Sequence, residues 1–270
     1  MNLTEKKVVN MLSRERVRAE RGVSERIAIT HLNSPTIFES HNGQLGSVLK
    51  LSGIPFDTES NDKLNSARRS WHHALTQLDE SFFVMVHTIR RKLDVSLEGQ
   101  SDNDFCAYVD KAYYQKFINT QLFANDIYLT ILYKGFDTGK LGALSQLAKR
   151  LSNKTIKNAR HKWRKEGVAE LTKAVTQLKS SLARFDSRVL GENDETLGYS
   201  ELLSFLALPV NGAEHIPFKM PCGHVGQYLP AKRIFFNRYI ELQSEDGASR
   251  FGAILTIKRY PDVRDRKSVV

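Results

Sequence analysis

The chain has few cysteines and no long apolar run. It contains 2 cysteines in 270 residues, so a disulfide framework is not expected and a reducing cytosolic setting fits best. No stretch approaches the roughly 18 to 20 apolar residues that a membrane-spanning helix needs. The N-terminal stretch MNLTEKKVVNMLSRERVRAERG lacks the apolar core of a secretory signal. With 41% hydrophobic and 26% charged residues, the composition is that of a globular protein.

The sequence also lacks the residue patterns of common catalytic and metal sites. Residues 131–141, ILYKGFDTGKL, have the form of a strand followed by a glycine loop, where a nucleotide-binding P-loop would lie. A P-loop needs four residues between its glycines and a hydroxyl after its lysine. Gly135 and Gly139 enclose only three residues, and Leu141 stands at the hydroxyl position. We interpret the stretch as a strand-to-helix linker.

No zinc site or catalytic constellation is predicted either. The one Cys-Gly-His run has no second ligand pair at metal spacing, and no Gly-x-Ser-x-Gly motif is present. We therefore assign no catalytic, cofactor-binding or metal-ligating residue to this chain, and we do not expect it to be an enzyme by itself.

The net charge of +10 comes from one segment. Residues 134–189 carry 14 Lys and Arg against 4 acids, an excess equal to that of the whole chain. Several of these cations recur at steps of four and three, which places them on one helix face that can follow a phosphate backbone. The alternatives are a solvated face, an acidic protein partner or anionic lipid headgroups. The candidate partner- or nucleic-acid-binding residues are Arg150, Lys154, Lys157, Arg160, Arg164 and Lys165.

Apolar periodicity and turn residues predict an α+β fold. Extended runs at 35–40 and 45–51 flank His41-Asn42-Gly43, a β-hairpin turn signal. A helix is expected from Asn61 to about Leu78, then a buried strand at 81–90, a helix at about 102–123 and a strand at 126–133. The order β-β-α-β-α-β indicates a mixed sheet with helices packed on it. The residues of the second helix expected to face the core are Phe105, Val109, Ala112, Tyr113, Phe117 and Ile118.

The second half begins with a basic helical segment, at about 141–190. Its apolar residues alternate steps of three and four over three heptads, a seam formed by Val168, Leu171, Val175, Leu178, Leu182, Phe185 and Val189. We expect this seam to pack within the chain, because three heptads are near the minimum for a free-standing coiled coil. A short helix at 200–208 is expected to stop at Pro209. Strands at 233–243 and 250–259, joined by Glu245-Asp246-Gly247, are expected to form a C-terminal hairpin.

These features divide the chain into three parts. Residues 1–26 form a polar N-terminal arm, and residues 27–134 an α/β sheet subdomain. Residues 135–270 form the helical segment and C-terminal hairpin, packed with the sheet as one N-terminal domain.

In this order the features resemble the N-terminal domain of the CagE/TrbE/VirB family, the front part of the large ATPase of bacterial type IV secretion and conjugation machines. The resemblance is carried by residues 41–56, beginning His41-Asn42-Gly43, by the strand 126–133, and by Glu201–Gly212. It is also carried by residues 251–261, which end in Lys258-Arg259-Tyr260-Pro261. Together they extend over about 30–261.

The resemblance implies a role in an ATP-driven machine. In that family the site for ATP and magnesium lies in a RecA-like domain after this region. The present sequence ends at Val270 and offers no positions for those residues, so we expect a fragment of a parent ATPase. The implied role is docking and assembly at the cytoplasmic face of the bacterial inner membrane, in support of protein or DNA transport. The implied partners are inner-membrane secretion components and sibling ATPase subunits, with an oligomer forming in the full-length protein. The alternative is a nucleic-acid-binding module acting through residues 134–189 by DNA contact.

Overall fold

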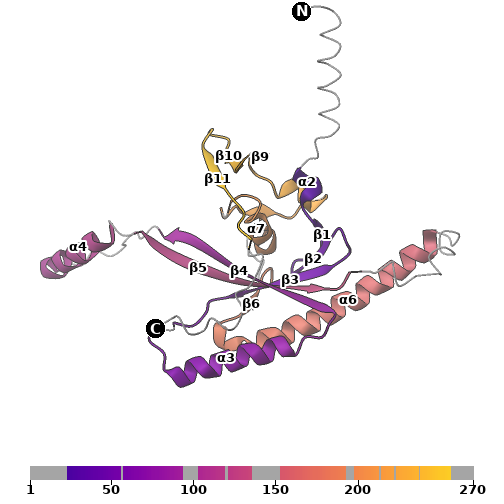
Figure 1. The fold of residues 1–270 in the computed structure, drawn as a ribbon, viewed down its shortest axis with the longest axis horizontal. Coiled ribbons are helices and arrows are strands. Elements are labelled where there is room, and N and C mark those ends of the chain that lie inside the picture. Colours follow the sequence, from indigo (N-terminus) through magenta and orange to yellow (C-terminus); the bar gives the residue numbers. More distant parts are fainter. Residues whose placement is uncertain are drawn as a thin grey trace, which may run out of the picture.

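An α+β fold is seen in the computed structural model, which confirms the predicted class (Figure 1). The structure describes residues 23–55, 57–93, 103–118, 121–135, 153–192, 198–212, 214–221, 223–236 and 238–256. Most of the predicted polar arm and the glycine linker after Gly135 lie outside the described residues. The described part is built on one large sheet with helices on both of its faces.

The large sheet has six strands, and its pairings are antiparallel. The strands are β1 Ile29–Ser34, β2 Ile37–Ser40, β3 Leu45–Leu51, β4 Phe82–Leu93, β5 Leu122–Tyr133 and β6 Arg188–Val189. Their order is β1-β2-β3-β5-β4, and β6 pairs with β3. The predicted hairpin between β2 and β3 is confirmed. Gly43 in its turn has a φ of 73°, a left-handed conformation that glycine adopts without a Cβ clash. The sequence prediction missed β1.

Helices cover the two faces of this sheet. The helices α3 Asn61–Thr76 and α6 Asn153–Ser181 lie on one side and α7 Glu201–Ala207 on the other (Figure 1). Successive strand residues point to opposite faces, so Leu45 and Leu49 of β3 join the cluster under α6, while Val48 joins the cluster under α7. Both faces of β3 and of the second half of β5 are therefore buried.

The packing of α6 confirms one part of the heptad prediction and corrects another. Leu171, Val175 and Leu178 are buried against the sheet and α3, so the seam packs within the chain. The helix ends at Ser181, however, and the chain passes through a 3-10 turn, Ala183–Phe185, into β6. Asp186, with a φ of 50°, redirects the backbone there. Residues 182–189 still contribute to the same core, but as a turn and a strand, so extending the helix to Val189 was wrong.

The predicted burial of the strand at 81–90 and of the second helix was also wrong. β4 is the edge strand of the sheet, and several of its large apolar side chains are exposed. The strands β4 and β5 extend beyond the body as a two-stranded ribbon, and α4, Asp104–Ile118, lies at its far end (Figure 1). Phe105, Val109 and Tyr113, expected to face the core, are exposed.

The C-terminal third packs around α7. Its small elements are β7 Tyr199–Ser200, β8 Phe218–Lys219, α8 Val225–Tyr228, β9 Arg233–Phe236, β10 Ile240–Gln243 and β11 Ser249–Gly252. The short helix α2, Val23–Arg26, comes from the other end of the chain and contacts α8. The predicted α7 is confirmed, with the Ser200 hydroxyl accepting a hydrogen bond from the Leu203 amide as its N-cap. The predicted strand 233–243 is instead two strands, β9 and β10, which pair with each other, and β11 pairs with β10. The turn before β11 is confirmed, with Gly247 at a φ of 84°.

Candidate functional site

The predicted basic residues occupy different environments in and before α6. Arg150 lies outside the described residues. Lys154 and Lys157 lie in the first turns of α6, where the structure describes the helix but not these side chains. Lys165 is exposed. The remaining two, Arg160 and Arg164, turn toward the sheet and contact a carboxylate of β2.

That carboxylate belongs to Glu39, which is fully buried on β2. Arg164 donates from Nε to Glu39 Oε2 at 2.8 Å and from Nη2 to Oε1 at 3.1 Å, and Arg160 donates from Nη2 to Oε1 at 3.3 Å. The side chains of Asn33 and His31 on β1 also reach Glu39 Oε2, at 3.2 and 3.3 Å. The cluster therefore ties α6 to the β1–β2 hairpin.

The protonation of Glu39 follows from these contacts. Burial works to raise the pKa of its carboxyl, but hydrogen bonds from Arg164 and Asn33, with the Arg164 charge, outweigh burial and lower the pKa. Glu39 is thus ionised at neutral pH. Sequence reasoning missed it because Arg164 is 125 positions away, and no local pattern pairs a strand glutamate with a distant helix.

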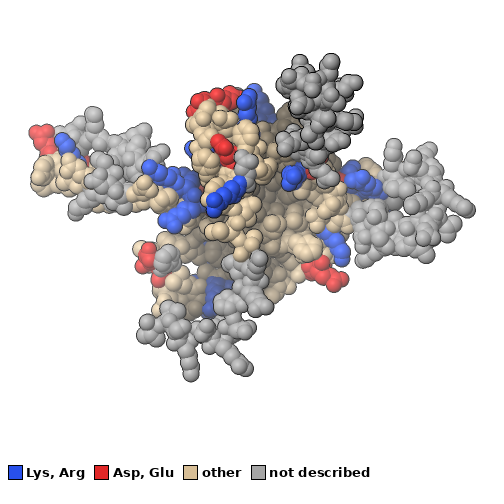
Figure 2. Space-filling model, turned by 45° about the horizontal axis from the view of Figure 1, so that its top comes forward, with Lys and Arg blue, Asp and Glu red and all other residues tan. Residues whose placement is uncertain are grey.

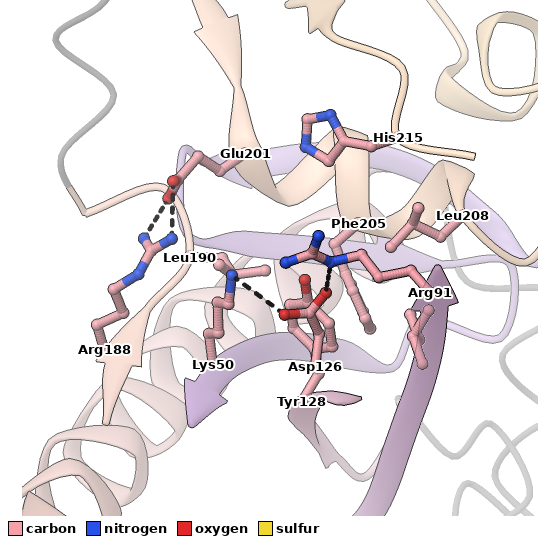
Figure 3. A pocket seen from close by; sticks show the side chains of 11 residues that line it. Lys50, Arg91, Asp126, Tyr128, Arg188, Leu190, Glu201, Phe205, Leu208 and His215 are labelled. Carbon is pink, nitrogen blue, oxygen red and sulfur yellow. Dashed lines mark hydrogen bonds and ion pairs between the residues drawn. The ribbon is translucent and has the colours of Figure 1, made fainter. Parts of the chain in front are cut away.

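A second charged cluster lines a cavity of about 280 Å³ between the sheet and α7 (Figure 3). On the sheet side, Arg91 Nε donates to Asp126 Oδ2 at 2.6 Å, and Lys50 Nζ lies 4.0 Å from Asp126 Oδ1. At the rim, Arg188 of β6 makes a two-pronged pair with Glu201 of α7, at 2.7 and 3.0 Å. In Figure 3 the Lys50–Asp126–Arg91 group lies beside Tyr128, and the Arg188–Glu201 pair lies apart from it on the left of the view.

Two groups that line the cavity have shifted pKa values. The hydrogen bond from Arg188 lowers the pKa of Glu201, and burial raises the pKa of Tyr128. Glu201 therefore stays charged at neutral pH, and Tyr128 stays protonated. A general base or acid works best with a pKa near the operating pH, and these shifts run the other way. The described residues also contain no group of three or more His, Cys, Asp or Glu placed to hold a metal ion.

An exposed apolar row lies on α4. The side chains of Phe105, Tyr108, Val109 and Tyr113 are 72%, 72%, 47% and 57% exposed. Tyr108, Val109 and Tyr113 follow Phe105 by three, four and eight positions, which places all four on one helix face. The ribbon sets α4 away from both cores (Figure 1). Such a row is typical of a surface that binds another protein. The sequence located this apolar face correctly but assigned it to the core.

The basic side chains gather at separate places on the surface. In Figure 2, Lys and Arg side chains gather where the ribbon leaves the body and, separately, on the opposite side of the view. Among the helices that the structure describes, none combines the length and the apolar character required to cross a membrane.

Comparison with known proteins gives two consecutive family matches. Residues 36–140 match the family described as the N-terminal domain of the type IV secretion system ATPase VirB4/TrbE. Residues 188–267 match the CagE, TrbE, VirB family, described as a component of type IV transporter systems.

Individual relatives carry names of the same kind. The type IV secretion system protein virB4 of Bartonella quintana is 26% identical over 237 residues, covering 86% of this chain and 29% of that relative. The type IV secretion system protein PtlC of Bordetella pertussis is 23% identical over 251 residues. The alignment covers 90% of this chain and 29% of PtlC. The chain thus spans less than a third of the relatives it matches. It belongs to the VirB4/TrbE family of type IV secretion system ATPases and matches the N-terminal region of that family.

Proposed function

We propose that this chain is the docking and assembly domain of a type IV secretion ATPase, supporting ATP-driven transport of protein or DNA across the bacterial envelope. The observation that carries the proposal is the exposed apolar row of α4. Its partners are inner-membrane secretion components and sibling subunits, met at the cytoplasmic face of the membrane. In this proposal ATP and magnesium are bound by another part of the parent protein.

The row on α4 has the composition of a docking site. Aromatic side chains such as Phe105 and Tyr108 bury about 150–250 Å² each when covered, and they are enriched among the residues that dominate binding energy. An amphipathic helix commonly inserts such a row into a groove of its partner. Because the row contributes little to the two cores of this fold, its apolar surface is available for a partner.

The test compares α4 with a matched surface elsewhere. Inner-membrane vesicles from cells that carry the secretion apparatus are sedimented with the purified chain, and the bound fraction is measured. The double variant Phe105→Ser and Tyr108→Ser should bind at least about tenfold more weakly, since truncating a central contact costs about 2 kcal/mol or more. Phe251→Ser in β11 is the control, because this phenylalanine is 71% exposed but lies in the three-stranded sheet and not on α4. The proposal is contradicted if the α4 double variant binds as well as the Phe251→Ser variant. It is also contradicted if the unmodified chain binds equally well to vesicles that lack the apparatus.

A nucleic-acid-binding role through residues 134–189 is the second candidate. The local charge excess supports it. The engagement of Arg160 and Arg164 by Glu39 counts against it, because these guanidinium groups already neutralise a buried carboxylate. We therefore favour docking.

A further inference from the structure

The outer edge of β4 is a long unpaired strand edge. β4 runs for 12 residues and pairs with β5 at every position from Phe82 to Leu93 without a bulge. Within the residues that the structure describes, no other strand pairs with β4. Such an edge presents a row of backbone N–H and C=O groups to another strand, and proteins commonly block it with charges, prolines or bulges. The first half of β4 has no charged residue, no proline and no bulge.

The first half of β4 is apolar on both faces and open to solvent. Phe83, Met85 and Val86 are 54%, 48% and 55% exposed. Phe83 and Met85 lie on one face of the sheet and Val86 on the other, because side chains alternate along a strand. A strand added to this edge would cover all three, so the exposed surface favours an extended apolar segment as the occupant.

The charges that flank this apolar centre have opposite signs. Asp79 and Glu80 come just before β4, and Arg90, Arg91 and Lys92 form its far end. A second β4 running antiparallel places the acidic end of each copy beside the basic end of the other. A two-fold symmetric interface requires this kind of self-complementarity, because the same patch must match itself. A partner with one sign of charge would match only one end.

One register satisfies both the apolar and the charged residues. With Met85 on the two-fold axis, Phe83 faces the partner's His87 and Val84 faces the partner's Val86. Glu80 then approaches the partner's Arg90. The register keeps each face of the sheet continuous, since facing residues point to the same side. His87 is compatible with this setting because its Nε2 already contacts the Thr130 hydroxyl at 3.1 Å.

We propose that two copies of this chain associate through antiparallel pairing of their β4 edges, with Met85 at the symmetry axis. The pairing joins the two large sheets into one. It does not use the apolar row of α4, so it stands independently of the docking role and can occur together with it.

The first experiment measures dimerisation of the full 270-residue chain by sedimentation equilibrium. The wild type should be a dimer in equilibrium with monomer. Glu80→Arg or Arg90→Glu alone places like charges together at two symmetric points and should weaken dimerisation about tenfold. The double variant restores opposite charges and should return to the wild-type dissociation constant. Both residues are exposed, so the fold should not change. Glu245→Arg, in the exposed turn before β11, is the control and should have no effect.

The second experiment tests the register by cross-linking. In a chain with Cys106→Ser and Cys222→Ser, Met85→Cys should form a disulfide between copies on mild oxidation, because facing Cβ atoms in adjacent strands lie about 4.5–5.5 Å apart. Thr88→Cys should not, because the two Thr88 positions are offset by roughly 20 Å in this register. A chain that is monomeric at all concentrations would overturn the proposal. A dimer unaffected by the charge changes, or cross-linked more readily through position 88, would overturn it as well.

Discussion

Replacing Glu39 by glutamine should destabilise the fold by about 2 kcal/mol at neutral pH. Removing one partner of a buried ion pair costs about 3–5 kcal/mol, because the other charge is left uncompensated. Here the side chains of Arg164 and Arg160 are 31% and 51% exposed, so water can hydrate part of their charge and the cost should be smaller. Glutamine keeps the shape and one acceptor oxygen. The expected loss corresponds to about a 30-fold change in the unfolding equilibrium.

Urea unfolding of the chain and of Glu39→Gln measures this difference. The matched control is Glu192→Gln, because Glu192 pairs with Lys179 at 2.6 Å on the surface. That change should cost less than about 1 kcal/mol. The folded-state pKa of Glu39 lies below its ordinary value of 4.5. Its contribution is therefore complete above the unfolded-state pKa and is lost as the pH falls through the lowered folded-state pKa. A difference below about 0.5 kcal/mol at pH 7, or one that persists unchanged in acid, would refute the role assigned to Glu39.

Three further predictions concern the core and the ligands. Gly46→Ala should destabilise the fold by about 1–3 kcal/mol in urea unfolding, because the added Cβ would lie 2.2 Å from the Phe38 ring; an unchanged midpoint would show that the ring moves aside at no cost. Titration calorimetry of the chain with Mg-ATP should show no saturable binding, since Gly135–Leu141 is one residue short of a P-loop; saturation abolished by Lys140→Ala would contradict this. Duplex DNA binding should be weak at physiological salt, whereas four phosphate contacts would give a steep loss of about 150-fold between 50 and 200 mM salt. Saturable sub-micromolar binding that Lys154→Glu with Lys157→Glu removes would favour the nucleic-acid role.

Local patterns in the sequence were enough to predict most elements of the fold. The helix α3 begins at Asn61 as predicted, since Ser60 caps it by accepting a hydrogen bond from the Lys63 amide. The hairpin at Gly43 and the helix α7 also follow from short-range turn and capping chemistry. These signals reside in neighbouring residues, so no knowledge of the tertiary structure is needed to read them.

Burial could not be predicted in the same way. The run Phe82–Val86 is typical of a buried strand, but β5 pairs between β3 and β4, which leaves β4 at the edge. That placement depends on which strands pair across the sheet. For α4, periodicity identifies the apolar face but does not indicate whether another element covers it.

The basic residues illustrate the same limit for the candidate site. Arg160 and Arg164 are four positions apart, which places them on one side of α6. That spacing cannot show that a glutamate more than 100 positions earlier takes up both guanidinium groups. A contact of that kind is set by the packing of α6 on the sheet, and packing is absent from a local pattern.

The docking role is tested most directly by site-specific photo-cross-linking within the assembled secretion apparatus. A photoreactive amino acid is placed in the full-length parent protein at Tyr108 on α4, with Phe251 on β11 as the comparison position. Both side chains are highly exposed, at 72% and 71%. The account predicts cross-links from position 108 to another subunit of the apparatus and few from position 251. Absence of cross-links at 108 in an apparatus that still transports its substrate would contradict docking through α4.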